Sequence, residues 1–139
     1  MLRPVYPQIP PTKRNVGPDS VRRLEIWRDG LELVAEAYAL TASWPSHELY
    51  GLTGQVRRAA VSIPTNLAEG VGRGSAPEAA RFGQIALGSV YELQTLLEIA
   101  VRLRFSDAET LRKFQEALDT LARRVSQFIR YKRSQGRPG

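Results

Sequence analysis

Apolar residues between positions 20 and 134 recur at alternating intervals of three and four. That spacing puts them on one face of an α-helix, and no segment alternates apolar and polar residues as a strand does. Four such stripes follow one another, and together they predict an all-α chain. The stripes are Leu24, Trp27, Leu31, Val34 and Tyr38; Leu49, Leu52, Val56, Ala59, Ile63 and Leu67; Phe82, Ile85, Ser89, Leu93, Leu96 and Ala100; and Leu111, Phe114, Leu118, Leu121, Val125 and Phe128.

Breaks and capping residues set the expected helix bounds at about 20–43, 46–70, 76–104 and 107–133. Ser46 after Pro45 is an N-cap candidate, and the runs 75–78 and 106–109 each have the form of a capping box that begins with serine. Three glycines are expected to end the second helix, and Pro64 should kink or split it near Ser62–Ile63. The glycines are Gly70, Gly72 and Gly74.

Short connections between long helices predict an up-down-up-down antiparallel four-helix bundle. The third helix is apolar around most of its circumference, which indicates burial on more than one side and favours self-association. The alternative is a wide core face with a few exposed leucines. The additional apolar residues are Ala86, Leu87, Val90, Leu97, Ile99, Val101 and Leu103.

The ends of the chain differ from the bundle at 20–134. Residues 1–19 hold five of the nine prolines and are expected to form an extended arm, and residues 135–139 form a short basic tail. No apolar run resembles a signal peptide or a transmembrane helix. Together with the absence of cysteine, this predicts a cytoplasmic protein.

Candidate chemistry is limited by composition. The chain has no cysteine and a single histidine, His47, so thiolate or histidine-rich metal sites and a Ser-His-Asp triad are not expected. We therefore predict no catalytic residues, no metal and no cofactor. An enzyme that uses Glu69 or Glu92 with Arg57 or Arg58 is a third hypothesis, after a nucleic-acid-binding protein and a protein-interaction module.

Charge gives a positive indication of function. The 20 basic residues, 17 of them arginine, exceed the 14 acidic residues and give a net charge of +6, which favours an anionic partner such as RNA or DNA. Residues 123–137 contain six basic side chains and no acidic one, with a tyrosine that could stack on a base. The alternative is a solvated helix end whose cations complement the helix dipole. The candidates are Arg123, Arg124, Arg130, Tyr131, Lys132, Arg133 and Arg137.

Two other segments permit two interpretations each. Arg57 or Arg58 could bind phosphate, or could form a structural ion pair with Glu69 or Glu92. The run 69–75 is rich in glycine like a phosphate loop, but a turn between two helices explains the same glycines.

Several motifs resemble a known family. They are Leu24-Glu25-Ile26-Trp27, Trp44-Pro45, the run 48–52, the long run 55–70 (QVRRAAVSIPTNLAEG), Gly72-Arg73 and the run 86–93 (ALGSVYEL). The chain resembles bacterial four-helix-bundle proteins found within intervening sequences of large-subunit ribosomal RNA genes, and their relatives, the accessory variability determinants of diversity-generating retroelements. The resemblance covers roughly residues 21–132.

The resemblance implies a homopentameric barrel with a basic surface. In the retroelement branch, it implies binding of RNA and of a reverse transcriptase, without enzymatic activity; the intervening-sequence branch implies a scaffold or protein-interaction module. The residues that match the family motif either bind a ligand or stabilise the fold. They are Arg57, Arg58, Asn66, Glu69, Gly70, Arg73, Gly88, Ser89 and Glu92.

Overall fold

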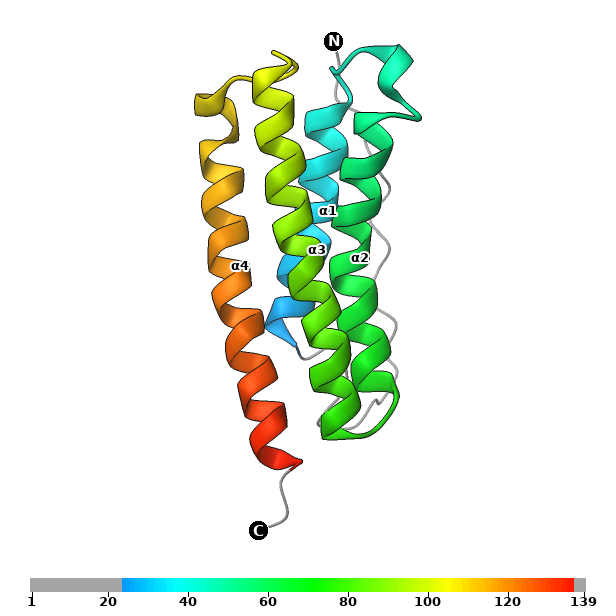
Figure 1. Cartoon of the computed structure of the whole chain (residues 1–139), viewed down its shortest axis with the longest axis vertical. Helices are drawn as coiled ribbons and strands as arrows, with labels where there is room; N and C mark the ends of the chain where they lie inside the picture. Colours follow the sequence, from blue (N-terminus) through cyan, green and yellow to red (C-terminus); the bar gives the residue numbers. More distant parts are fainter. Residues whose placement is uncertain (1–23, 137–139) are drawn as a thin grey trace.

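The computed structural model describes residues 24–136, and these residues form four long helices (Figure 1). The order is α1 (Glu25–Thr41), a short 3-10 helix η2 (Ser46–Glu48), α2 (Leu52–Gly72), α3 (Ala76–Arg102) and α4 (Ala108–Gln135). No strand occurs among the described residues, so the all-α prediction is confirmed for them. The predicted arm at 1–19 and the last part of the predicted tail, 137–139, lie outside the described residues.

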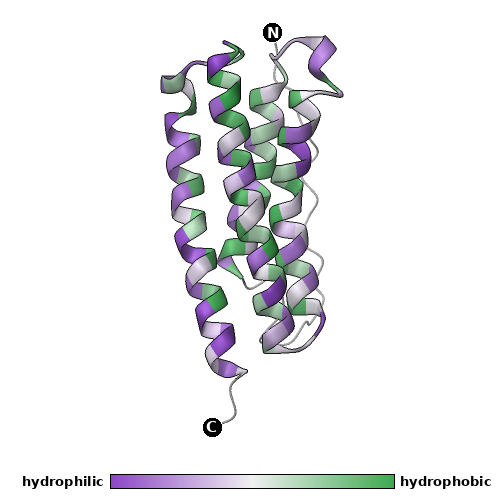
Figure 2. Ribbon diagram, in the orientation of Figure 1, coloured by the Kyte–Doolittle hydropathy of each residue, from purple (hydrophilic) through white to green (hydrophobic). Residues whose placement is uncertain are grey.

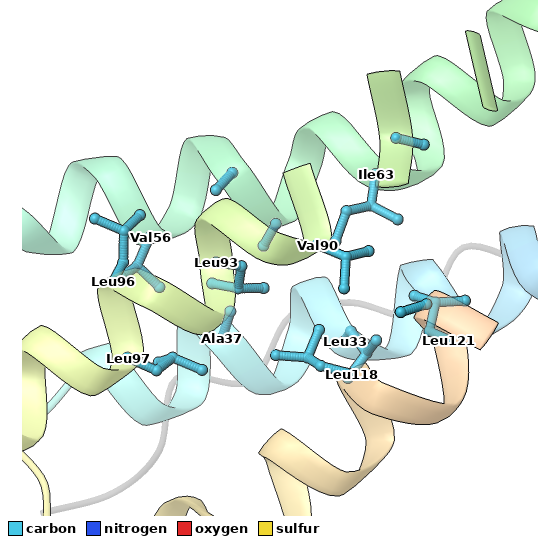
Figure 3. Close-up of a cluster of buried hydrophobic side chains, with 14 of the residues drawn as sticks. Leu33, Ala37, Val56, Ile63, Val90, Leu93, Leu96, Leu97, Leu118 and Leu121 are labelled. Atoms are coloured by element: carbon cyan, nitrogen blue, oxygen red, sulfur yellow. The ribbon is translucent and has the colours of Figure 1, made fainter. Parts of the chain in front are cut away.

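The helices lie side by side, and the connections between consecutive helices are at alternate ends of the molecule (Figure 1). Helix α3 makes the most extensive contacts, first with α2 and then with α4, and among the pairs of long helices that are in contact α1 and α4 touch least. The core lies between all four helices, and Figure 3 shows Leu33 of α1 close to Leu118 and Leu121 of α4. Leu93 and Leu97 of α3 are completely buried in this core.

The predicted stripe on α1 is partly wrong. Leu31 is 43% exposed, and the buried positions of α1 are Ile26, Gly30, Leu33, Ala37 and Thr41. The reason is the close contact of α1 with α2: a Cβ atom at Gly30 would lie 3.3 Å from Cβ of Pro64. The small residues Gly30 and Ala37 therefore share the inner face of α1 with Ile26 and Leu33, where the sequence pattern favoured large residues throughout.

The start of the second helix also differs from the prediction. Ser46 begins the 3-10 helix, and α2 begins only at Leu52, after Gly51. The Glu48 carboxylate caps α2, because its Oε2 accepts a hydrogen bond of 2.9 Å from the Leu52 backbone N–H. Pro64 does not split α2, which continues as one helix past it to Gly72.

The other helix ends confirm some capping residues and correct others. Leu24 is extended, so α1 begins at Glu25, and residues 20–23 of the predicted first helix lie outside the described residues. Ser75 caps α3 as predicted, and its hydroxyl accepts from the Glu78 N–H at 3.3 Å. The cap of α4 is Asp107, not Ser106, because the Asp107 carboxylate accepts from Thr110.

The apolar circumference of α3 is mostly covered within one chain. Ala86, Leu87, Val90 and Leu97 are all buried, whereas Ile99 and Leu103 are exposed, so one bundle leaves part of this apolar surface uncovered. The exposed apolar residues are Ile85, Tyr91, Ile99 and Leu103. No described helix has the length and apolar character needed to cross a membrane.

Candidate nucleic-acid interface

Charge is segregated along the described chain. Residues 24–122 contain nine basic and thirteen acidic side chains, whereas residues 123–136 contain five basic side chains and no acidic one. These last residues form the second half of α4, on which Figure 2 shows many hydrophilic positions. The positive potential of the described body is therefore concentrated at the lower end of the molecule in Figure 1.

Arg123 and Arg130 are the most accessible of the predicted residues. Both are exposed, and Arg123 contacts the Thr120 hydroxyl at 3.4 Å. Neither arginine forms an ion pair with a carboxylate of the described residues. Their guanidinium groups are thus available to phosphate.

Arg124 has a structural role that the sequence did not indicate. Its guanidinium bonds to the Asp29 carboxylate and, at 2.7 Å, to the Glu25 carboxylate, both on α1. This cluster joins α1 to α4, the pair with the fewest contacts among the long helices that touch each other. We therefore remove Arg124 from the candidate interface.

The remaining predicted residues lie near the end of α4. Tyr131 is 59% exposed, and its hydroxyl accepts from Gln135 at 2.8 Å. The Lys132 ammonium lies 5.8 Å from the ring centroids of both Phe128 and Tyr131. Arg137 lies outside the described residues.

Arg133 contacts α3. Its guanidinium donates to Oε1 of Gln84 at 3.3 Å, and both side chains line a groove of about 590 Å³ with Arg81 and Ile85. Arg81 and Gln84 were not predicted from the sequence, because they become neighbours of Arg133 only when the start of α3 packs beside the end of α4.

Several family-motif residues form the interface between α2 and α3. The Asn66 amide donates to the Ser62 backbone carbonyl at 2.8 Å and to the Ser62 hydroxyl at 2.9 Å. The Ser62 hydroxyl is 2.7 Å from the hydroxyl of Ser89, which is buried. These three side chains satisfy one another between packed helices, which favours a structural role for Asn66 and Ser89.

Arg57 does not form the ion pair considered from sequence. Its Nε donates to the Thr41 hydroxyl at 2.9 Å, and its guanidinium carbon lies 4.5 Å from the centroid of the Tyr38 ring. Arg57 therefore attaches α2 to α1.

Three other motif residues, Arg58, Gly88 and Glu92, are exposed. No hydrogen bond or ion pair to another described residue involves the side chain of Arg58 or Glu92. The predicted pairing of Arg57 or Arg58 with Glu69 or Glu92 is absent among the described residues, because Glu69 bonds to Arg73 at 3.1 Å.

The run 69–75 forms a helix-to-helix turn. Helix α2 continues to Gly72, and Gly74 has the positive φ of 79° that the turn requires. Gly70 lies inside α2 and does not end it, contrary to prediction. A Cβ atom at Gly70 would lie 2.7 Å from Cβ of Phe82, so Gly70 permits close packing of α2 on α3.

Hydrogen bonds from the backbone and side chain of Thr110 hold the pKa of the Asp107 carboxyl below its ordinary value, as expected of a helix cap. No group of three or more metal-ligating side chains occurs among the described residues.

Comparison with family models finds a match for most of the chain. A family model described as "23S rRNA-intervening sequence protein" matches residues 22–127. A search of curated proteins finds no match to this chain. The matched segment ends before Arg130, Tyr131, Lys132 and Arg133, so the candidate interface depends on charge and geometry rather than on the match.

Proposed function

Because the chain belongs to the family of 23S rRNA-intervening sequence proteins, we propose that it is a non-enzymatic accessory protein that binds nucleic acid, RNA above all. The proposed interface consists of four side chains on the second half of α4. They are Arg123, Arg130, Lys132 and Arg133. The observation that carries the proposal is the segregation of charge, since residues 123–136 contain no acidic side chain while the rest of the described body has an acidic excess.

Phosphate contacts predict how strongly the affinity depends on salt concentration. If each of the four cations neutralises one phosphate of single-stranded RNA, the logarithm of affinity falls with the logarithm of salt concentration with a slope of about −3. Raising salt from about 50 to about 200 mM then weakens binding roughly 50-fold. Tyr131 is exposed beside these cations and can add stacking.

The test compares two variants with the same change in charge. In the interface variant, Arg123, Arg130, Lys132 and Arg133 become glutamine. In the matched control, the same substitution is made at the opposite end of the bundle. The control residues are Arg102, Arg104, Arg112 and Lys113, all exposed. Anisotropy of fluorescein-labelled single-stranded RNA should show loss of affinity and of salt dependence only in the interface variant. Equal losses in both variants would refute the assignment of the interface.

We also propose that the four helices form an up-down-up-down antiparallel bundle and that five copies of the chain assemble into a homopentameric barrel. The connections between consecutive helices lie at alternate ends of the molecule in Figure 1, which supports the up-down-up-down arrangement. The exposed apolar residues of α3, which include Ile99 and Leu103, support self-association. Light scattering tests the assembly, and a mass of 15.5 kDa at micromolar concentration would exclude it.

We assign the chain to the cytoplasm and to a retroelement of the diversity-generating kind, where it would assist a reverse transcriptase. The likeness of its motifs to the accessory variability determinants supports this branch of the proposal. A reverse transcriptase gene and a repeat pair beside this gene would favour it, and their absence would count against it. Turnover of nucleotides or nucleic acid by the pure protein would refute the non-enzymatic role.

One observation favours a second function, that of a protein-interaction scaffold without a direct role in nucleic-acid binding. An apolar groove of about 370 Å³ lies between α1 and α2, lined by Leu31, Val34, Ala35, Tyr38 and Val61. Binding of a protein partner to this groove should be lost in the Leu31→Asp variant and retained in the interface variant. The opposite result would favour the nucleic-acid function.

A further inference from the structure

We propose that the groove between the start of α3 and the end of α4 holds one unpaired base of bound RNA, with its adjacent phosphate at the rim. This inference rests on the proposed function, because the cations of α4 would bring the strand to the groove. It assigns a ligand to residues that lie outside the α4 cluster, above all Arg81 and Gln84 of α3 and Ile85 beside them.

The rim of the groove offers hydrogen-bond donors from both helices. Oε1 of Gln84 accepts from the Arg133 guanidinium at 3.3 Å, which leaves the Gln84 amide N–H groups to donate elsewhere. Arg81 and Arg133 carry only donors. A ligand for this rim must therefore supply acceptors, as phosphate oxygens and base carbonyls do.

The charge of the rim is positive. Glu78 lies 3.2 Å from Arg81, and Arg73 pairs more closely with Glu69, at 3.1 Å, than with Glu78, at 3.9 Å, so Glu78 balances the charge of Arg81 and the net positive charge comes from Arg133. Arg133 pairs with no carboxylate of the described residues, and its contact is the neutral amide of Gln84. The groove thus attracts an anion, and its unshared cation lies on the α4 side.

The groove also offers a surface for a flat apolar group. Pro77, Ala80 and Ile85 line it, and Ile85 is 44% exposed. The Arg81 guanidinium carbon lies 4.5 Å from the centroid of the Phe82 ring, and the Arg81 side chain is 56% exposed. A base can stack on the outer face of a guanidinium that is held in this way.

The dimensions suit one nucleotide. The volume of about 590 Å³ is within the usual range of small-ligand sites. Gly136 lies against Pro77 in this groove, because a Cβ atom there would lie 3.2 Å from Cγ of Pro77. A base paired within a duplex cannot enter such a groove, so the protein should prefer single-stranded RNA to duplex RNA.

The experiment distinguishes the contribution of the base to the binding affinity from that of the phosphates. Anisotropy is measured with a short fluorescein-labelled single-stranded RNA and with the same strand carrying abasic positions. The proteins are the wild type, a groove variant with Gln84→Ala and Ile85→Ala, and the control Ile99→Ala. Ile99 is on the same helix and is 40% exposed, so the control matches the loss of exposed apolar surface on α3. Circular dichroism and light scattering verify that fold and mass are unchanged.

We expect the wild type and Ile99→Ala to bind the normal strand about five- to 100-fold more tightly than the abasic strand. The groove variant should lose most of this preference, because only stacking on Tyr131 remains, and should keep the wild-type salt slope. A groove variant that keeps the full wild-type preference for the normal strand would overturn the base site while leaving the α4 interface intact. Failure of the interface variant to lose affinity would instead overturn the proposed function.

Discussion

Gly70 and Gly88 provide a matched test of how α2 packs on α3. Both are family-motif glycines within helices, but their surroundings are opposite. A Cβ atom at Gly70 would lie 2.7 Å from Cβ of Phe82 and 3.2 Å from Cα of Ala79, whereas a Cβ atom at Gly88 would have no neighbour within 4 Å among the described residues. Replacement by alanine should therefore change stability in opposite directions at the two sites.

The magnitudes follow from two competing effects. Alanine in place of a helical glycine stabilises by about 1 kcal/mol, and Gly88→Ala should show this gain alone. At Gly70 the close atoms belong to a Cβ and to the backbone of α3, so no side-chain rotation relieves them. Overpacking of this kind costs about 3 kcal/mol, which leaves a net loss of about 2 kcal/mol for Gly70→Ala.

Urea and thermal unfolding of both variants, at one protein concentration, measure the difference. For a chain of this size about 1 kcal/mol corresponds to roughly 3 °C, so Gly70→Ala should melt about 6 °C below the wild type and Gly88→Ala about 3 °C above it. A Gly70→Ala protein as stable as the wild type would refute the close contact of α2 with α3. If Gly88→Ala instead lowers stability, and does so more at high protein concentration, Gly88 is covered in an assembly.

Three further substitutions test single features. The buried Thr53 hydroxyl has no hydrogen-bond partner among the described residues, so Thr53→Val should stabilise by about 1 kcal/mol in urea unfolding; a loss of stability would reveal a partner. Arg104 ends α3 with a positive φ of 63°, so Arg104→Gly should raise stability by up to about 1 kcal/mol, and a lower melting temperature would contradict the left-handed backbone there. The lowered pKa of Asp107 means that its stabilising contribution is present above the unfolded-state pKa and is lost as pH falls through the folded-state pKa, so the deficit of Asp107→Ala relative to the wild type should shrink below about pH 4. A deficit independent of pH would show that the carboxylate charge does not contribute.

The sequence predicted those features of the fold that depend on local pattern. The stripes of α2 and α4 matched buried positions such as Val56 and Leu118, because helical period and burial agree there. The pattern failed on α1, where contact with Pro64 demands a small residue at Gly30. It also chose Ser106 as the cap of α4, whereas the Ser106 hydroxyl accepts from the Trp44 indole N–H at 2.9 Å. Both Gly30 and Ser106 are determined by contacts with residues distant in the sequence, and the helical period of apolar residues does not predict such contacts.

The candidate site was predictable in its charge but not in its composition. The basic run from Arg123 onward is visible in the sequence, and residues 123–136 remain free of acidic side chains. The engagement of Arg124 by α1 depends on Glu25 and Asp29, almost a hundred positions away, and could not be read from the run itself. Likewise, Arg81 becomes relevant only because α3 begins where α4 ends.

The alternate positions of the connections have a further consequence. Four is an even number, so the chain leaves the bundle at the end where it enters, and the start of α1 and the last turn of α4 are both toward the lower end in Figure 1. Residues 1–23 carry five basic side chains and one acidic one, and residues 137–139 carry one arginine. All of these charges are covalently tethered to the end that carries the α4 cations, which raises the effective concentration of cations around a bound strand. An affinity tag or a dye would therefore disturb binding least on the opposite end, for example near the exposed Tyr50.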